Sequence, residues 1–144
     1  MKTGLHPEPT VFVIFGAGGD LASRKLVPAL YNLFLDEWMP REYQILGVGH
    51  GEMNEEDYRV HLRKGVDNFS RRGKAKKDSW VDFASHVSFV SAELGESKAY
   101  QDMAKRLSAL DKEWKIRANH VFYLALPPSL IGDVVKGLAA AKLN

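Results

Sequence analysis

Near its N-terminus the chain reads Val11-Phe-Val-Ile-Phe-Gly-Ala-Gly-Gly-Asp-Leu-Ala-Ser-Arg-Lys-Leu26, where an apolar run passes through glycines into a helical pattern. The apolar run, residues 11–15, is typical of a strand that is buried on both faces of a parallel sheet. Glycines at 16, 18 and 19 allow positive φ and a close approach of the backbone to a ligand. Asp20 can cap the following helix, whose free N–H groups and positive dipole end favour a phosphate. The stretch therefore predicts a strand, a phosphate-binding turn and a helix.

The spacing within this turn, Gly16-x-x-Gly19-x-x-Ala22, resembles a dinucleotide fingerprint. Glycine spacings also arise by chance, so a plain surface turn with a helix cap remains the alternative. A second apolar strand, from Tyr43 to Val48, follows at the distance that is typical of dinucleotide-binding folds, and this context favours nucleotide binding. The residues expected to contact the cofactor here are Gly16, Ala17, Gly18, Gly19, Asp20 and Leu21.

Strand and helix patterns alternate along the rest of the chain, which predicts an α/β fold with a doubly wound, Rossmann-like parallel sheet. Right-handed crossovers predict the strand order 3-2-1-4, incomplete at the C-terminal edge, with a ligand crevice where the first and fourth strands diverge. We expect a flexible tail over 1–10 and one dinucleotide-binding domain over 11–144. The expected strands are 11–15, 44–49, 87–91 and 120–126, and the expected helices are 20–37, 54–69, 78–84, 97–113 and 128–142.

Two of the helical patterns carry further predictions. Pro28 removes one backbone hydrogen bond within 20–37, so a local kink is expected just after Arg24 and Lys25. Beyond this kink the residues expected to pack against the sheet are Leu26, Leu30, Leu33 and Phe34. In the helix over 97–113, a three-to-four spacing predicts one buried face, formed by Tyr100, Met103, Ala104, Leu107 and Leu110.

The fourth strand is expected to end at Leu126-Pro-Pro128, because proline cannot continue a central ladder. Backbone groups at 125–127 would then face the crevice, and simple strand termination before a helix is the alternative. The residues expected to contact the cofactor at this end are Ala125, Leu126 and Pro127.

Composition limits the class of protein. With 144 residues and 45% apolar content, the chain can build one core without a metal or disulfides, and it contains no cysteine. No histidine or carboxylate pair has metal-ligand spacing, so no metal site is predicted. No apolar run is long enough for a membrane span and the N-terminus has no signal-peptide core, so we expect a soluble, cytoplasmic protein without a membrane partner.

Charge argues against a nucleic-acid partner, because the formal net charge is only +2. The one concentrated basic stretch, Arg71-Arg-Gly-Lys-Ala-Lys-Lys77, contains no interleaved aromatic residue. We therefore expect a solvated connector between two helices.

A longer stretch, Gly16-Ala-Gly-Gly-Asp-Leu-Ala-Ser-Arg-Lys-Leu-Val-Pro-Ala-Leu-Tyr-Asn-Leu33, closely resembles the start of glucose-6-phosphate dehydrogenase. Ile45-Leu-Gly-Val-Gly-His-Gly-Glu52 and Val121-Phe-Tyr-Leu-Ala-Leu-Pro-Pro-Ser129 agree with that family in order and spacing. The resemblance spans nearly the whole chain but covers only the first part of a typical member. It implies the N-terminal NAD(P)-binding domain of an enzyme of the pentose phosphate pathway, a route of glucose metabolism. Such an oxidoreductase oxidises glucose 6-phosphate to 6-phosphogluconolactone by hydride transfer to NADP.

The resemblance also assigns a role to Lys25, which in the family lies near the sugar phosphate and the reacting centre. Taken alone, a lysine one turn into a helix is usually a solvated charge. The family's histidine base and its substrate-binding segments would lie beyond Asn144, so no catalytic residue is expected within these residues. The chain is expected to bind the cofactor without turnover.

The choice of nicotinamide cofactor depends on the end of the second strand, where NADP enzymes place a basic residue and NAD enzymes a carboxylate. His50 stands at the family's arginine position, and Gly51 and Gly18 replace other donors to a 2′-phosphate. His50 can still contribute a charge if a bound phosphate raises its pKa, whereas Glu52 can hold a ribose diol. NADP is favoured and NAD remains the alternative.

A non-catalytic module that binds a dinucleotide or associates with another subunit is the alternative to the enzyme domain. The strand over 120–126 is apolar on both faces and would lie at an edge of the sheet, which invites self-association. We therefore expect a homo-oligomer or self-association through this strand.

Overall fold

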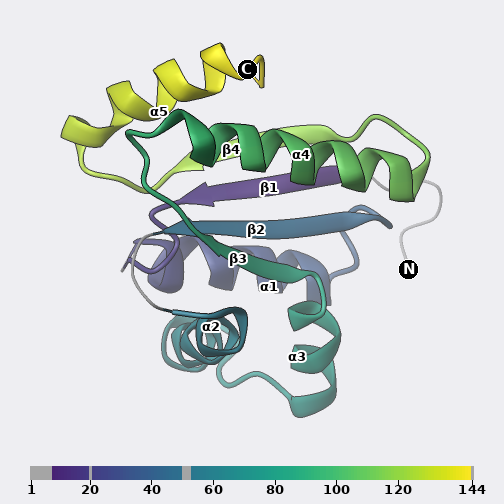
Figure 1. Cartoon of the computed structure of the whole chain (residues 1–144). Coiled ribbons are helices and arrows are strands. Elements are labelled where there is room, and N and C mark those ends of the chain that lie inside the picture. Colours follow the sequence, from purple (N-terminus) through teal and green to yellow (C-terminus); the bar gives the residue numbers. More distant parts are fainter. Residues whose placement is uncertain (1–7, 20, 50–52, 144) are drawn as a thin grey trace.

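Four parallel strands form a single sheet in the order β3-β2-β1-β4, which confirms the predicted topology (Figure 1). The computed structural model describes residues 8–19, 21–49 and 53–143. The strands are β1 (Thr10–Phe15), β2 (Tyr43–Gly49), β3 (Val87–Ser91) and β4 (Asn119–Leu124). The helices are α1 (Val27–Leu35), α2 (Glu55–Phe69), α3 (Lys77–Ala84), α4 (Ser97–Trp114) and α5 (Pro128–Ala140), and a π-helical turn, η1 (Ala22–Leu26), precedes α1.

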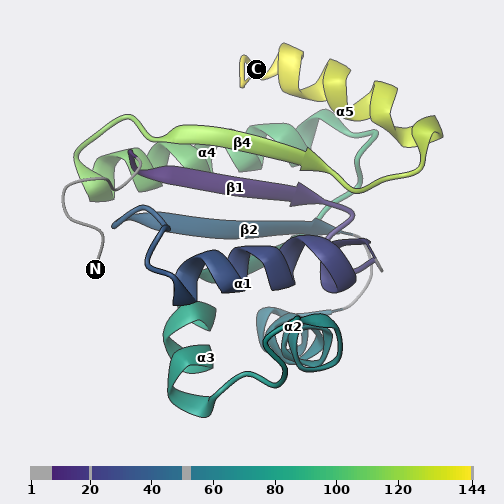
Figure 2. The same ribbon diagram turned by 180° about the vertical axis from the view of Figure 1, so that it is seen from behind.

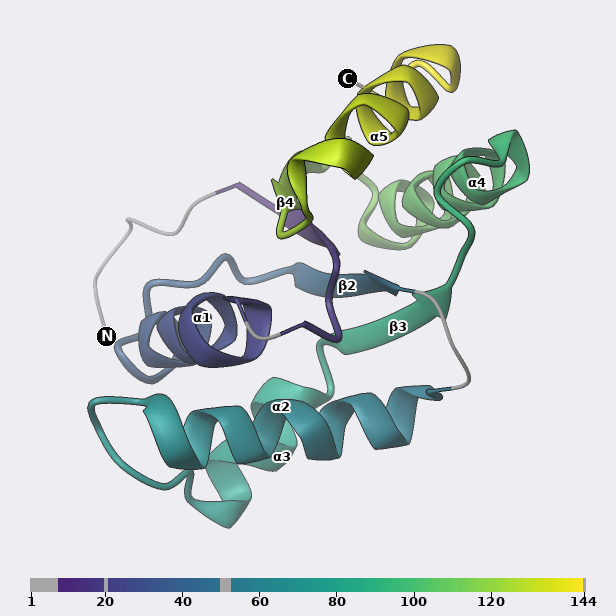
Figure 3. The same ribbon diagram turned by 90° about the vertical axis from the view of Figure 1, so that its left-hand side faces the viewer.

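Helices cover both faces of the sheet, as a doubly wound fold requires. The helices α1, α2 and α3 lie on one side, and α4 and α5 lie on the other (Figures 2 and 3). Alternate residues of β1 point to opposite sides, so that Ile14 packs in the α1–α3 core while Val13 and Phe15 pack in the α4–α5 core. The register places Phe15 beside both Val48 and Leu124, which brings the carboxyl ends of three strands together.

The predicted irregularity before Pro28 is present as the π-helical turn η1. The Val27 N–H donates to the Ala22 carbonyl, five residues back, and the regular helix α1 then continues through Pro28. Gly65 of α2 accommodates this wider turn, because a β-carbon at position 65 would stand 2.4 Å from the Ser23 carbonyl oxygen. Close packing of α2 therefore supports the helix that follows the glycine turn.

Several predicted boundaries and one buried position need correction. The single predicted helix 20–37 is η1 followed by α1 and ends at Leu35, and β4 ends at Leu124 rather than at residue 126. Leu33 does not pack against the sheet, because 43% of its surface is exposed. By contrast, Tyr100, Met103 and Leu107 are buried as the α4 pattern predicts, while Ala104 and Leu110 are half-buried. The predicted tail, 1–10, lies largely outside the described residues, and its boundary stays a prediction.

Among the described helices, none is both long enough and apolar enough to cross a membrane.

Candidate functional site

The glycine turn after β1 is anchored to the end of β2. Gly16 has a φ of 79°, a left-handed conformation that glycine adopts without strain. The N–H groups of Gly16 and Ala17 both donate to the Val48 carbonyl, at 3.0 and 3.2 Å, and the Gly19 N–H donates to the Gly16 carbonyl at 3.0 Å. The turn is thus held in one shape by backbone hydrogen bonds.

The same turn meets the end of β4. A β-carbon at Gly16 would stand 2.2 Å from the Ala125 carbonyl oxygen and 3.1 Å from a methyl carbon of Leu126. The Ala125 N–H donates to the Phe15 carbonyl at 3.0 Å and therefore belongs to the sheet. The prediction that this N–H faces the ligand crevice is wrong. The structure therefore brings together the two segments that the sequence singled out separately.

The outer part of the turn remains accessible. Gly18 and Gly19 are exposed, and no hydrogen bond between described residues uses the Gly18 N–H. The Ser23 N–H donates to the Gly19 carbonyl at 3.3 Å, which connects the turn to the helix. Leu21 is 47% exposed, whereas Ala17 is fully buried and contributes packing beneath the turn. An accessible glycine backbone at the start of a helix is suited to an anionic group.

Pro127 and Pro128 redirect the chain after β4. Pro127 has φ −58° and ψ 147°, and Pro128 occupies the first turn of α5. Proline suits both positions, because its fixed φ is compatible with a helix start and its missing N–H is not needed there. The described residues of the turn, 16–19 and 21, and residues 125–127 thus offer backbone groups and aliphatic side chains, and none of them has a carboxylate or an imidazole. Such a surface can hold a dinucleotide, and its described side chains include no group that could accept a proton.

Lys25, the other predicted site residue that the structure describes, is not part of this junction. Lys25 is exposed on η1 and lines a pocket of about 440 Å³ between α1 and the end of α2, whose described lining contains no residue of the glycine turn or of 125–127. Asp20, His50 and Glu52 lie outside the described residues.

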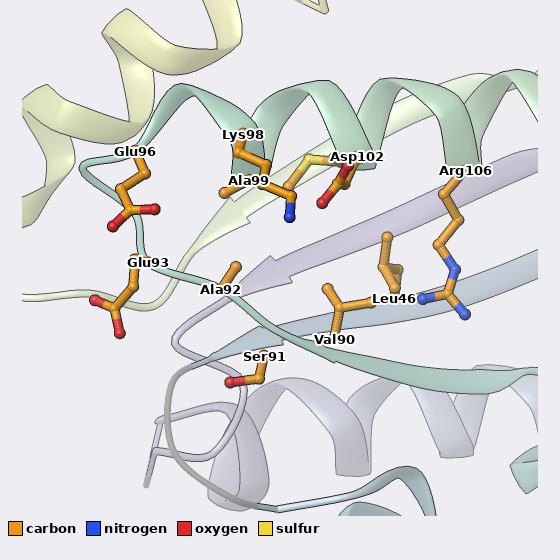
Figure 4. Close-up of a pocket in the computed structure, with 11 residues that line it drawn as sticks. Leu46, Val90, Ser91, Ala92, Glu93, Glu96, Lys98, Ala99, Asp102 and Arg106 are labelled. Carbon is orange, nitrogen blue, oxygen red and sulfur yellow. The ribbon is translucent and has the colours of Figure 1, made fainter.

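A second pocket, of about 490 Å³, lies where β3 runs into α4 (Figure 4). Leu46 and Val90 form its floor, and the side chains of Asp102 and Arg106 extend from α4 above them. Arg106 also pairs with Glu55 of α2, with 3.5 Å between nitrogen and oxygen. No motif in the sequence predicts this pocket. Its available signal was the four-residue spacing of Lys98, Asp102 and Arg106, which places three charges on one side of a helix.

Comparisons with known proteins agree with the geometry. The family model described as "Glucose-6-phosphate dehydrogenase, NAD binding domain" matches residues 13–144. Glucose-6-phosphate 1-dehydrogenase of Treponema pallidum is 37% identical over 136 residues, which are 94% of this chain and 26% of that protein. The corresponding protein of Bacillus subtilis is 32% identical over 139 residues, or 96% and 27% of the two chains.

Solved structures give the same result. A glucose-6-phosphate dehydrogenase in complex with its substrate glucose 6-phosphate superimposes with a TM-score of 0.81 and 31% identity, over 93% of this chain and 28% of that chain. Glucose-6-phosphate 1-dehydrogenase from Mycobacterium avium superimposes with a TM-score of 0.79 and 26% identity, over 95% and 28% of the two chains. The chain thus spans about a quarter of the length of these relatives.

Proposed function

The chain belongs to the glucose-6-phosphate dehydrogenase family, within its NAD-binding domain, and from this premise we propose that its glycine turn holds the pyrophosphate of NADP. Membership of the family implies that the cofactor is a nicotinamide dinucleotide. The preference for NADP over NAD is an additional part of the proposal. Gly18, Gly19 and Leu21 supply the exposed part of the turn, with Asp20 between them in the sequence. The dinucleotide supplies a hydride acceptor, and the protein positions it.

One observation supports this placement of the pyrophosphate most directly. Gly16, in a left-handed conformation, lies against the Ala125 carbonyl, so the glycine turn and the end of β4 form one continuous backbone surface. The exposed glycines lie on that surface, at the beginning of a helix whose dipole favours an anion. The residues present therefore fit a dinucleotide phosphate.

The proposed preference for NADP rests on His50, which follows β2 in the sequence where the 2′-phosphate is recognised in this class of fold. Calorimetric titration with NADP and NAD at pH 6 and pH 8 tests it. We expect NADP to bind more tightly at pH 6, because a protonated imidazole attracts a phosphate. His50→Ala should remove this pH dependence without affecting NAD. A preference for NAD at both pH values, abolished by Glu52→Gln, would contradict the proposal.

For a full-length member of the family that contains this domain we propose oxidation of glucose 6-phosphate, with Lys25 contacting the sugar phosphate as a point charge. Oxidation at C1 requires a base to accept the hydroxyl proton while the hydride moves to the nicotinamide. The described turn and residues 125–127 contain no such base, so the chain alone should bind the cofactor without turnover. Mixing the chain with glucose 6-phosphate and NADP should produce no reduced nicotinamide. Formation of the reduced cofactor at a rate proportional to the chain concentration would contradict this assignment.

Subunit association through β4 is a second candidate function, compatible with the first. β4 is an edge strand, and Val121 and Tyr123 expose 46% and 37% of their surface there. An edge strand with exposed apolar residues is a template for pairing with another strand. We expect concentration-dependent dimers in light scattering, and Val121→Lys should reduce them. A monodisperse monomer at high concentration would rule this candidate out.

A further inference from the structure

An ion pair joins the two helices that flank the free edge of β3. Glu55 is the first residue of α2, on one face of the sheet, and Arg106 lies in the middle of α4, on the other face (Figure 3). A guanidinium nitrogen of Arg106 stands 3.5 Å from a carboxylate oxygen of Glu55. Because β3 is the outermost strand on this side of the sheet, the two side chains meet around its edge. We call this contact the Glu55–Arg106 pair.

The Glu55 carboxylate belongs to a small network at this edge. One of its oxygens accepts from the Phe89 N–H at 3.4 Å and pairs with Arg106, and the other stands 3.8 Å from Arg59 of the same helix. Arg59 in turn donates two hydrogen bonds to the Val87 carbonyl, at 3.2 and 2.7 Å. A single exposed ion pair contributes little, whereas several charges that form a network contribute more. The network therefore fastens the first turns of α2 to β3 and α4.

The pair affects the position of α2 more than its formation. The Asn54 side chain accepts from the Asp57 N–H at 2.8 Å and so caps the helix without help from α4. Figure 4 shows the Arg106 side chain extending from α4 toward the sheet. Asp102 lies one turn before Arg106 on α4, yet the described ion pair of Arg106 is with Glu55. Arg106 thus sets where the start of α2 lies relative to the sheet.

The position of this helix start matters for the cofactor, a step that rests on the proposed function. His50, which carries the proposed preference for NADP, lies between β2 and α2 in the sequence. On the β2 side the Gly49 carbonyl accepts from the Ala92 N–H at 2.7 Å, and on the α2 side Glu55 contacts β3 and α4. Fixing both flanks of a short segment reduces the conformational entropy that it loses when a ligand binds. We propose that Arg106, acting through Glu55, positions the start of α2 for recognition of the 2′-phosphate of NADP.

An effect of charge alone differs from positioning in the sign that it predicts. Arg106→Ala removes a positive charge, and Glu55→Gln removes a negative one. A phosphate that responds only to these charges would bind less tightly to the first variant and more tightly to the second. Positioning predicts weaker NADP binding for both variants, because each of them breaks the same pair.

Calorimetric titration of the full chain with NADP and with NAD tests the proposal. We expect Arg106→Ala and Glu55→Gln each to weaken NADP binding about threefold and to leave NAD binding unchanged, because NAD has no 2′-phosphate. The double variant should lose no more affinity than either single variant, since the same pair is broken in all three. Lys105→Ala is the matched control, because it removes the same charge at the neighbouring, exposed position of α4, and it should bind like the wild type.

Three binding results would overturn the proposal. Unchanged or tighter NADP binding by Glu55→Gln would reduce the effect to charge. Equal losses of affinity for NADP and NAD would make the pair a structural contact without a role in specificity. Losses that add in the double variant would mean that Arg106 acts independently of Glu55.

Hydrogen exchange distinguishes failure of this inference from failure of the proposed function. In Arg106→Ala the amide of Asp57, in the first turn of α2, should exchange faster than in the wild type and in Lys105→Ala. Equal exchange would show that the pair does not hold the helix start, and it would overturn the inference whichever cofactor binds. Tighter binding of NAD than NADP by the wild type would overturn the proposed preference, and this inference with it, even if exchange is faster in the variant.

Discussion

The carbonyl oxygen of Ala125 lies so close to the Cα of Gly16 that a β-carbon at position 16 would stand 2.2 Å from it. No real β-carbon contact is that short, and the Ala125 carbonyl is backbone that is itself tied to β1. Position 16 also has a φ of 79°, which is unfavourable for residues with side chains. Glycine is therefore required at position 16 for two reasons, the positive φ of its backbone and the close contact with the Ala125 carbonyl.

Gly16→Ala should destabilise the protein by at least about 2 kcal/mol, because the strained φ alone costs roughly 1–3 kcal/mol and the contact adds to it. Urea unfolding followed by circular dichroism measures the change. Gly18→Ala is the control, because a β-carbon there would meet nothing within 4 Å. Its stability should stay close to that of the wild type, and equal losses for the two variants would refute the argument.

Removing the hydroxyl group should have opposite effects on the free energy of unfolding at two buried tyrosines, Tyr58 and Tyr100. The Tyr58 ring is fully buried against Gly47, and its hydroxyl has no hydrogen-bond partner in the described structure. Tyr58→Phe should leave the free energy of unfolding unchanged or raise it by up to about 1 kcal/mol. The Tyr100 hydroxyl donates to the Leu94 carbonyl at 2.6 Å, so Tyr100→Phe should cost about 1 kcal/mol. Chemical denaturation measures the free energy of unfolding of both variants. A larger loss of stability for Tyr58→Phe than for Tyr100→Phe would contradict this prediction.

The free edge of β3 is protected by side chains of α2. Arg59 donates to the Val87 carbonyl from Nε and Nη2, at 3.2 and 2.7 Å, and the Phe89 N–H points to a Glu55 carboxylate oxygen at 3.4 Å. Arg59→Ala should destabilise by about 1 kcal/mol and increase self-association, because it exposes strand groups that can pair with another chain.

Sedimentation velocity measures the association of Arg59→Ala. Lys64→Ala, an exposed substitution on the same helix, is the control and should remain like the wild type. If Arg59→Ala sediments as the wild type does at the same concentration, the edge does not depend on this side chain.

Burial lowers the pKa of His120 below its ordinary value of 6.5, with a raising effect of Asp111 and a lowering effect of Arg117. The unfolded chain therefore binds a proton more readily than the folded protein does. The stabilisation that arises from this difference in the pKa of His120 is fully present above about pH 6.5 and is lost as the pH falls through the lowered pKa. Urea midpoints between pH 8 and pH 5 should decline less for His120→Gln than for the wild type. Parallel declines would show that His120 does not contribute.

Much of the fold is predictable because the relevant signals are local. The apolar run, the glycines and the alternation of patterns predict each strand and the order of the sheet, since parallel strands with right-handed crossovers have few arrangements. The irregularity before Pro28 is predictable as well, because proline has no N–H whatever its surroundings. The prediction that Leu33 packs against the sheet is wrong, because the width of the buried stripe on a helix depends on which neighbouring elements cover that helix. The residue pattern of the helix does not contain that information.

The sequence by itself determined where the chain turns back and which turn presents its backbone to a ligand, because backbone conformation follows from residue type at each position. Only the tertiary structure decided that Gly16 abuts Ala125, and that Arg24 stacks on Phe69 beside Arg71. Phe69 precedes the basic stretch over 71–77 in the sequence, but Arg24 reaches its ring only when the end of α2 packs near η1. Such contacts join residues that are distant along the chain, and they exist only when the burial of apolar surface holds separate elements together.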